Sequence, residues 1–121
     1  MFRFDHFNFN FNILDLERSL RFYDEALGLK PVRSRDGDGF RLVFLGDGKT
    51  DFALELTWML ERSEPYDLGE QEYHLALTTT EYDAAYARHQ AMGCVAQEDN
   101  GRFYFITDPD GYWIEIIRRD A

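Results

Sequence analysis

Near its start the chain reads FNFNFNILDLERSLRFYDEALG over residues 7–28, an alternating segment followed by a helical one. Phenylalanine alternates with polar residues up to Phe11, and this period of two is typical of a strand, which we predict over 2–11. Leucine and tyrosine then recur at intervals of three or four residues, which predicts an amphipathic helix over 15–27. The helix has a suitable N-cap in Asp15 and a suitable C-terminal stop in Gly28.

The same order of elements occurs twice along the chain. Three strand-like runs follow the helix at 30–35, 40–45 and 52–59, with turns rich in glycine and aspartate between them. Beyond an acidic segment, a strand at 73–79, a helix at 82–92 and strands at 95–98, 102–107 and 112–118 repeat the pattern. The sequence therefore predicts an α+β fold of two βαβββ modules, residues 1–59 and 73–121. A linker at 60–72 joins them within one domain of 121 residues.

Composition limits the partners that we expect. Acidic residues outnumber basic ones by 23 to 13, and the formal net charge is −10, which repels nucleic acid and anionic membranes. No apolar run reaches the roughly 18 to 20 residues that span a bilayer, and no signal peptide is recognised at the N-terminus. The one cysteine, Cys94, cannot form an internal disulfide. We therefore expect a cytoplasmic protein that acts on a small molecule.

Two histidines and two glutamates occupy matching places in the two modules. His6 and His74 lie in the first strand of their modules, and Glu55 and Glu115 lie in the last strand. Symmetric packing of the modules would bring these four side chains toward one centre. Two imidazoles and two carboxylates, completed by water, suit a divalent metal such as Ni²⁺ or Zn²⁺, with Co²⁺ or Mn²⁺ as alternatives. The repeat therefore predicts one metal ion bound by His6, Glu55, His74 and Glu115.

Longer motifs around these residues carry a family resemblance. They are His6 with the helix that runs to Leu27-Gly28-Leu29, Leu54-Glu55-Leu56-Thr57, Tyr66-Asp67-Leu68-Gly69 before His74, and Thr107-Asp108-Pro109-Asp110-Gly111-Tyr112-Trp113-Ile114-Glu115. With these motifs the chain resembles the glyoxalase I branch of the vicinal oxygen chelate superfamily. The resemblance implies that the paired modules form a cupped mixed sheet. It also implies a homodimer whose subunits share each metal site.

The resemblance further implies a reaction. A thiol adds to a 2-oxoaldehyde such as methylglyoxal, and a metal-dependent lyase or isomerase converts this hemithioacetal to a 2-hydroxy thioester. The step is a proton transfer through an enediolate that the metal stabilises. Glu115 and Glu55 are the candidate bases. Glu115 is preferred because Trp113 and Ile117 flank it, and apolar surroundings favour proton uptake by a carboxylate.

Two positions depart from the family pattern. The family has an arginine four residues after the first histidine and an asparagine four residues after the first glutamate, and both help to hold glutathione. Here these positions are Asn10 and Met59, which leaves open whether glutathione or another thiol is used. The sequence does not specify the native metal or the physiological substrate. One alternative is a non-catalytic or resistance-type protein of the same fold that binds a small molecule. Another is an Fe(II) extradiol-type dioxygenase, in which Glu55 would be a superfluous fourth ligand.

Overall fold

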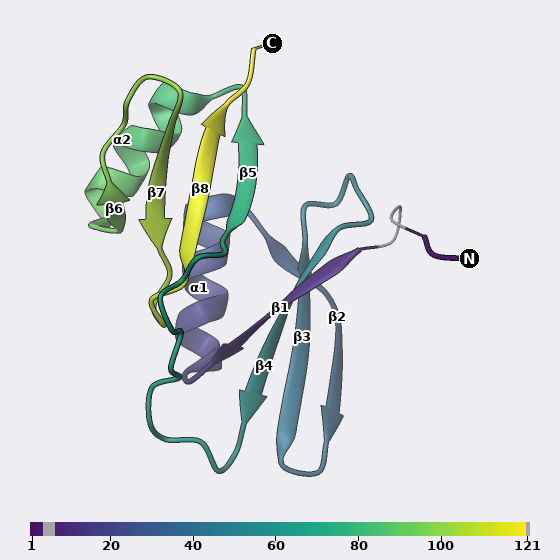
Figure 1. The fold of residues 1–121 in the computed structure, drawn as a ribbon. Coiled ribbons are helices and arrows are strands. Elements are labelled where there is room, and N and C mark those ends of the chain that lie inside the picture. The colour runs from purple at the N-terminus through teal and green to yellow at the C-terminus, as the bar shows by residue number, and fades with distance from the viewer. Residues whose placement is uncertain (4–6, 121) are drawn as a thin grey trace. The chain divides into compact units, whose positions relative to one another are not determined.

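The computed structural model describes residues 1–3 and 7–120 and contains two compact units, Met1–Tyr66 and Asp67–Ala121 (Figure 1). Each unit consists of one four-stranded mixed sheet and one helix, and in each the chain order is β-α-β-β-β. The α+β fold with two βαβββ modules, which the repeated pattern predicts, is therefore confirmed. No helix among the described residues is long and apolar enough to cross a membrane.

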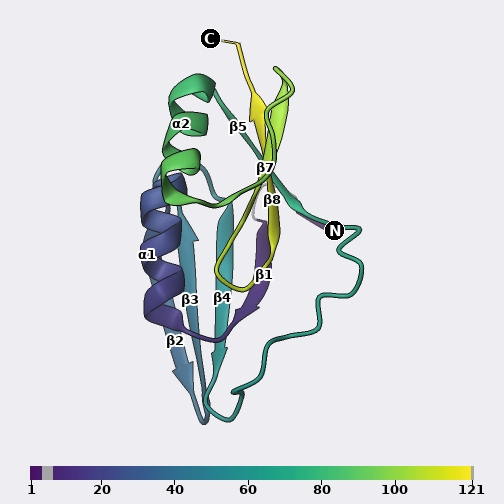
Figure 2. The same ribbon diagram turned by 90° about the vertical axis from the view of Figure 1, so that its left-hand side faces the viewer.

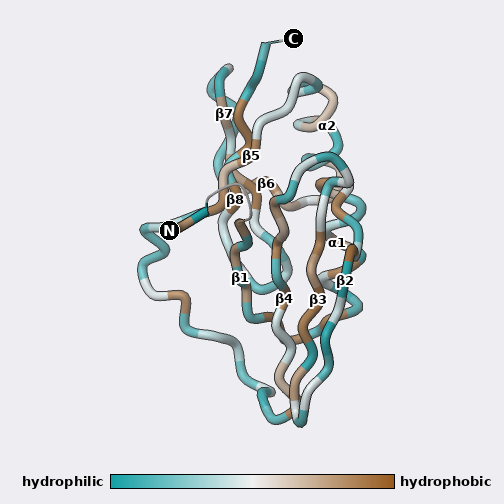
Figure 3. Tube along the Cα trace, turned by 90° about the vertical axis from the view of Figure 1, so that its right-hand side faces the viewer, coloured by the Kyte–Doolittle hydropathy of each residue, from teal (hydrophilic) through white to brown (hydrophobic). Residues whose placement is uncertain are grey.

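The first unit contains β1 (Asn8–Ile13), α1 (Leu16–Leu27), β2 (Lys30–Gly37), β3 (Phe40–Gly46) and β4 (Ala53–Met59). Its strand order is β1-β4-β3-β2; β1 runs parallel to β4, and the other neighbours are antiparallel. The helix lies along one face of this sheet (Figure 2). The sheet contributes apolar side chains from three strands to the core, and β3 is hydrophobic along most of its length in Figure 3. These side chains are Phe11, Ile13, Val43, Leu45, Leu54 and Leu56.

Helix α1 begins and ends as the sequence predicts. The Asp15 carboxylate accepts a hydrogen bond from the backbone N–H of Arg18 at 3.1 Å, and Gly28 ends the helix in the left-handed region with φ 66°. The buried row of the helix is Leu16, Ser19, Tyr23 and Ala26. The sequence predicts an apolar stripe of Leu16, Leu20, Tyr23 and Leu27. The buried row is turned slightly from this stripe, because Leu20 and Leu27 are only half-buried.

The second unit repeats this plan with β5 (Leu75–Thr79), α2 (Tyr82–Met92), β6 (Val95–Gln97), β7 (Phe103–Thr107) and β8 (Trp113–Arg118). Its strand order is β5-β8-β7-β6, and β5 runs parallel to β8. Helix α2 has the predicted bounds and ends at Gly93, where φ is 72°. Its residue His89 is buried, and the Nδ1 atom of His89 lies 2.7 Å from the hydroxyl of Tyr104 on β7. The two units thus share one topology.

The first strand differs from its predicted bounds. We predict a strand over 2–11, whereas β1 extends from Asn8 to Ile13. Its bounds follow from pairing with β4, which begins with Asn8 opposite Ala53 and ends with Ile13 opposite Trp58. The alternation of phenylalanine and asparagine shows the two faces of the strand, but the neighbouring strand determines where it starts and stops.

Candidate metal and catalytic site

The two predicted glutamates lie at equivalent points of the two sheets. Glu55 is on β4, with Asn10 of β1 and Phe44 of β3 as its cross-strand neighbours. Glu115 is on β8, with Ala76 of β5 and Phe105 of β7 as its neighbours. Leu54 and Leu56, which flank Glu55, are buried beneath α1, so that Glu55 points to the face that the helix leaves open. The same alternation along β8 places Glu115 on the open face of the second sheet.

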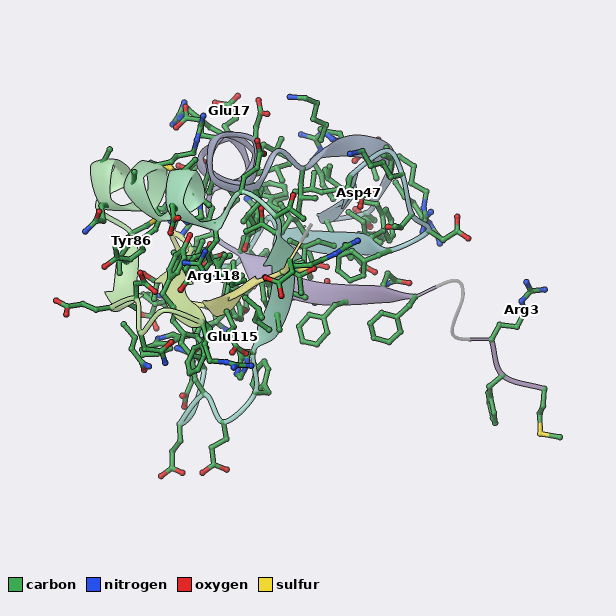
Figure 4. The ribbon with its side chains drawn as sticks, turned by 90° about the horizontal axis from the view of Figure 1, so that it is seen from above. Arg3, Glu17, Asp47, Tyr86, Glu115 and Arg118 are labelled. Carbon is green, nitrogen blue, oxygen red and sulfur yellow. The ribbon has the colours of Figure 1, made fainter. Side chains whose placement is uncertain are left out.

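In the second unit the structure brings two of the predicted ligands together. The Nε2 atom of His74 lies 2.8 Å from Oε1 of Glu115, and their side chains are 35% and 18% exposed. Seen from above in Figure 4, Glu115 lies on the side of the sheet away from α2, whereas Tyr86 lies on the helix side. An imidazole and a carboxylate that meet on an open face can bind one cation together, or can exchange a proton with a bound molecule.

Aromatic rings surround this pair. Phe105 meets the His74 ring edge-on with a centroid distance of 4.9 Å, and Phe105 also contacts Trp113 at 5.2 Å. Trp113 and Ile117 lie on the same face of β8 as Glu115. The second open face therefore combines one polar pair with an apolar floor, which suits the binding of a small organic molecule.

In the first unit Glu55 lies within a row of polar side chains. Nδ2 of Asn8 donates to Oε1 of Glu55 at 3.0 Å, and the Thr57 hydroxyl donates to Oδ1 of Asn10 at 2.5 Å. Asn10 in turn donates from Nδ2 to Oδ1 of Asn12 at 2.7 Å. We call these five residues of β1 and β4 the amide ladder. It fixes the orientation of Glu55 and places hydrogen-bonding groups along β1 and β4, while Phe44 of β3 occupies the position that Phe105 has in the second unit.

A pocket of about 360 Å³ lies next to the last residue of the amide ladder, and its lining is Asn12, Met59, Glu61, Arg62 and Tyr66. The Arg62 guanidinium stacks on the Tyr66 ring at 4.1 Å and donates to the backbone carbonyls of Glu64 and Pro65. The Tyr66 hydroxyl is buried and has no hydrogen-bond partner among the described residues. Of the two positions that depart from the family pattern, Met59 lines this pocket, whereas Asn10 belongs to the ladder.

The predicted ligand set is thus found in two parts. His74 and Glu115 meet in the second unit, Glu55 lies at the equivalent point of the first, and His6 lies outside the described residues. Over residues 1–3 and 7–120, no cluster of three or more His, Cys, Asp or Glu side chains that could hold a metal is found. The chemistry of the donors nevertheless fits a divalent cation, because an imidazole nitrogen and carboxylate oxygens are its usual ligands.

Sequence reasoning missed Asn8. It lies two residues before Asn10, the partner of Glu55, just as His74 lies two residues before Ala76, the partner of Glu115. In the sequence Asn8 is marked only by its position in the alternating segment. The pairing of β1 with β4 is needed to tell which residue of that segment lies beside Glu55.

Other titratable groups have structural roles. The Tyr82 hydroxyl donates to Asp99 at 2.5 Å, and this bond, with one from the Gly101 N–H, lowers the pKa of the Asp99 carboxyl. Arg118 stacks on the Tyr82 ring at 4.1 Å and pairs with Asp83, so these residues tie the turn after β6 to α2 and β8. Burial raises the pKa of the Cys94 thiol, which disfavours a thiolate nucleophile there.

Comparison with known proteins agrees with this arrangement. Residues 3–116 match the model of the glyoxalase/bleomycin resistance protein/dioxygenase superfamily. A lactoylglutathione lyase of Neisseria meningitidis is 39% identical over 120 residues, a match that covers 88% of this chain and 85% of that protein. A lactoylglutathione lyase of Arabidopsis thaliana is 32% identical over 120 residues; the match covers 90% of this chain, which spans only 42% of that relative.

A solved structure matches the fold as well. Glyoxalase I of Leishmania major, described as trypanothione-dependent, superposes with a TM-score of 0.84 at 32% identity. The superposition covers 93% of this chain and 85% of that one. Sequence and fold therefore point to the same group of proteins.

Proposed function

The chain belongs to the glyoxalase/bleomycin resistance protein/dioxygenase superfamily, and we propose that it is a metal-dependent lyase of the glyoxalase I type. Its substrate would be the hemithioacetal of a 2-oxoaldehyde and a thiol, and its product a 2-hydroxy thioester. The observation that carries the proposal is the His74–Glu115 pair at 2.8 Å on an open, aromatic-lined sheet face. Glu55 at the equivalent point of the other sheet supports it.

We propose that one divalent ion binds to Glu55, His74 and Glu115, with His6 as the predicted fourth ligand. Each site would take one pair of residues from a first unit and one from a second unit, and subunits of a homodimer would share it. When bound, the ion would supply positive charge that stabilises oxyanions developing on the substrate. The proposed ions are Ni²⁺ or Zn²⁺, with Co²⁺ and Mn²⁺ as alternatives, and the proposed location is the cytoplasm.

The protein's own groups would move the proton. The Glu115 carboxylate would take the proton from C1 of the hemithioacetal, and the C–H electron pair would pass into the enediolate. The same carboxyl group would then return the proton to the neighbouring carbon, while the proton of the C1 hydroxyl passes to the oxygen on that carbon, leaving a 2-hydroxy thioester. His74 orients Glu115, whereas the amide ladder holds Glu55. This difference makes Glu115 the preferred base and leaves Glu55 the second candidate.

The thiol would bind to a surface that lacks the arginine and the asparagine with which the family holds glutathione. The pocket beside the amide ladder offers one guanidinium, one carboxylate and the Tyr66 hydroxyl, which has no hydrogen-bond partner in the described part of the chain. Met59 lies in this pocket where the family has an asparagine. The relative from Leishmania major is described as trypanothione-dependent, whereas the relative from Neisseria meningitidis is named a lactoylglutathione lyase, so the names of the relatives point to more than one thiol. We therefore propose that the thiol cosubstrate of this site need not be glutathione.

The test is turnover of defined hemithioacetals. The full-length protein would be stripped with a chelator, reloaded with Ni²⁺, Zn²⁺, Co²⁺ or Mn²⁺, and assayed by thioester absorbance with methylglyoxal and a panel of thiols. We expect turnover only with a metal and with at least one thiol. A folded, metal-loaded protein that turns over none of them would overturn the proposal. Oxygen uptake with an aromatic diol would instead show a dioxygenase.

A further inference from the structure

The first sheet carries an amide where the second carries an imidazole. Asn8 and His74 each precede by two residues the strand partner of the glutamate in their own sheet, Asn10 and Ala76 respectively. Since side chains two residues apart point to the same face of a strand, both groups lie on the open face next to a glutamate. The strand register therefore makes Asn8, and not a histidine, the structural counterpart of His74.

Side-chain contacts lead independently to the same equivalence. Nδ2 of Asn8 lies 3.0 Å from Oε1 of Glu55, and Nε2 of His74 lies 2.8 Å from Oε1 of Glu115. Each carboxylate is thus approached by a nitrogen from the neighbouring parallel strand or from the residue just before it. The two sheets present the same pair of positions with different chemistry at one of them.

Building on the proposed function, we propose that Asn8 is the first-unit partner of Glu55 in metal binding, in place of the predicted His6. An asparagine binds a cation through its carbonyl oxygen, and Oδ1 and Nδ2 exchange places when the amide group turns over. The Asn8 amide, which donates to Glu55 in the structure, would then direct its oxygen to the ion. The site would contain one imidazole, two carboxylates and one neutral amide oxygen.

This ligand set favours a harder metal than two imidazoles would. Imidazole nitrogen suits nickel, copper and zinc, whereas carboxylate and carbonyl oxygens suit manganese and magnesium. A site with one nitrogen and three oxygens should therefore bind Ni²⁺ less tightly, relative to Mn²⁺, than a site with two imidazoles. Introducing a histidine at position 8 should shift this preference toward Ni²⁺.

The experiment counts bound imidazoles and measures affinity in the full-length protein. Pulsed electron paramagnetic resonance of the Cu²⁺-loaded protein detects the remote nitrogen of each coordinated imidazole, and competition with a chelating dye gives dissociation constants for Ni²⁺ and Mn²⁺. The variants are Asn8→His, Asn8→Ala and His6→Ala, with His74→Ala as the reference for a lost imidazole. Thermal unfolding of each metal-free variant checks that the fold is retained.

We expect one imidazole in the wild type, two in Asn8→His and none in His74→Ala. Asn8→His should tighten Ni²⁺ binding by at least about tenfold, whereas His6→Ala should change it by less than about twofold. Two imidazoles in the wild type, one of them lost in His6→Ala, would overturn this inference and leave the proposed function intact. If neither the wild type nor any variant binds a metal, both the inference and the proposed function fail.

Discussion

The open faces of the two sheets have the same topology but different chemistry. In the second unit Glu115 is flanked by aromatic rings and paired with an imidazole, whereas in the first unit Glu55 belongs to a row of amides and a hydroxyl. The strand order and the place of the glutamate are the same in both. The repeated framework therefore positions one carboxylate in each unit, and the surrounding residues give the two carboxylates different partners.

The sharpest test of this difference is to neutralise each glutamate in turn. Glu115→Gln should lower kcat by about 10²–10⁴, because it removes the proposed base, while metal stays bound at saturating concentration. Glu55→Gln should weaken metal binding by about 10- to 100-fold and lower kcat less. Steady-state kinetics with metal titrations measures both effects.

The exposed Glu70→Gln serves as the matched control and should leave kcat and metal affinity unchanged. A larger kcat loss in Glu55→Gln than in Glu115→Gln, with metal bound in both, would transfer the role of base to the first unit. Glu55 would then be the base, and Glu115 would serve mainly as a metal ligand.

The buried faces also differ, and stability measurements can show how much. Tyr104 and Val43 lie at equivalent points, opposite Ile116 and Leu56, but only Tyr104 brings a polar atom, which lies 2.7 Å from Nδ1 of His89. Tyr104→Phe should lower the free energy of unfolding by about 1–3 kcal/mol, because a buried polar pair loses one member. Denaturant titration measures this change.

Tyr86→Phe provides the control for Tyr104→Phe. The Tyr86 ring contacts the Tyr104 ring at a centroid distance of 4.8 Å, and Tyr86 is half-buried. Its substitution should change stability by less than about 0.5 kcal/mol. A change of less than about 0.5 kcal/mol for Tyr104→Phe as well would show that the hydroxyl of Tyr104 adds nothing to the second core.

The two helices begin differently, which gives a smaller effect. Asp15 caps α1 with its side chain, whereas Glu81 at the start of α2 makes no side-chain cap. Asp15→Ala should therefore lower the free energy of unfolding by about 1 kcal/mol, whereas Glu81→Ala should lower it by only about 0.3 kcal/mol. Comparable losses in both variants, measured by denaturant titration, would contradict the assignment of a cap to α1 alone.

The smallest effect concerns acid stability of the second unit. The pKa of Asp99 lies below its ordinary value of 3.8 because Tyr82 and the Gly101 N–H donate to it. Its ionisation therefore contributes stability above the unfolded pKa, and this contribution is lost as pH falls through the lower folded pKa. Asp99→Asn should flatten this acid loss, as thermal melts across acidic pH would show. Tyr82→Phe should flatten it in part; identical pH slopes in all three proteins would contradict the expectation.

Sequence patterns predicted the framework well because its signals are local. Asp15, Gly28 and Gly93 mark helix ends through their own side-chain or backbone preferences, and α2 has the bounds that were predicted. Glu55 and Glu115 could be found because the repeat places both on the last strand of a module. The division into one domain with a linker at 60–72 and the metal ligand set remain predictions.

The neighbourhood of Glu55 could not be predicted in the same way. Which residue of β1 lies beside it depends on the pairing of β1 with β4, a contact between segments far apart in the chain. A shift of two residues leaves every phenylalanine on its face, so hydrophobic patterning cannot select between His6 and Asn8. The register between β1 and β4, and not the periodicity of the sequence, identifies Asn8 as the residue beside Glu55.

This property of β1 has a wider consequence. The repeat of phenylalanine and asparagine from Phe7 to Asn12 is superimposable on itself after translation by two residues, so its sequence alone is degenerate with respect to sliding along β4. Only the non-repeating end, Ile13 packed in the core and the short connection to the Asp15 cap, removes the degeneracy. Lengthening that connection by two residues would let the strand slide by one repeat, so that Asn10 takes the place of Asn8 beside Glu55 without any change in the side chains of the strand.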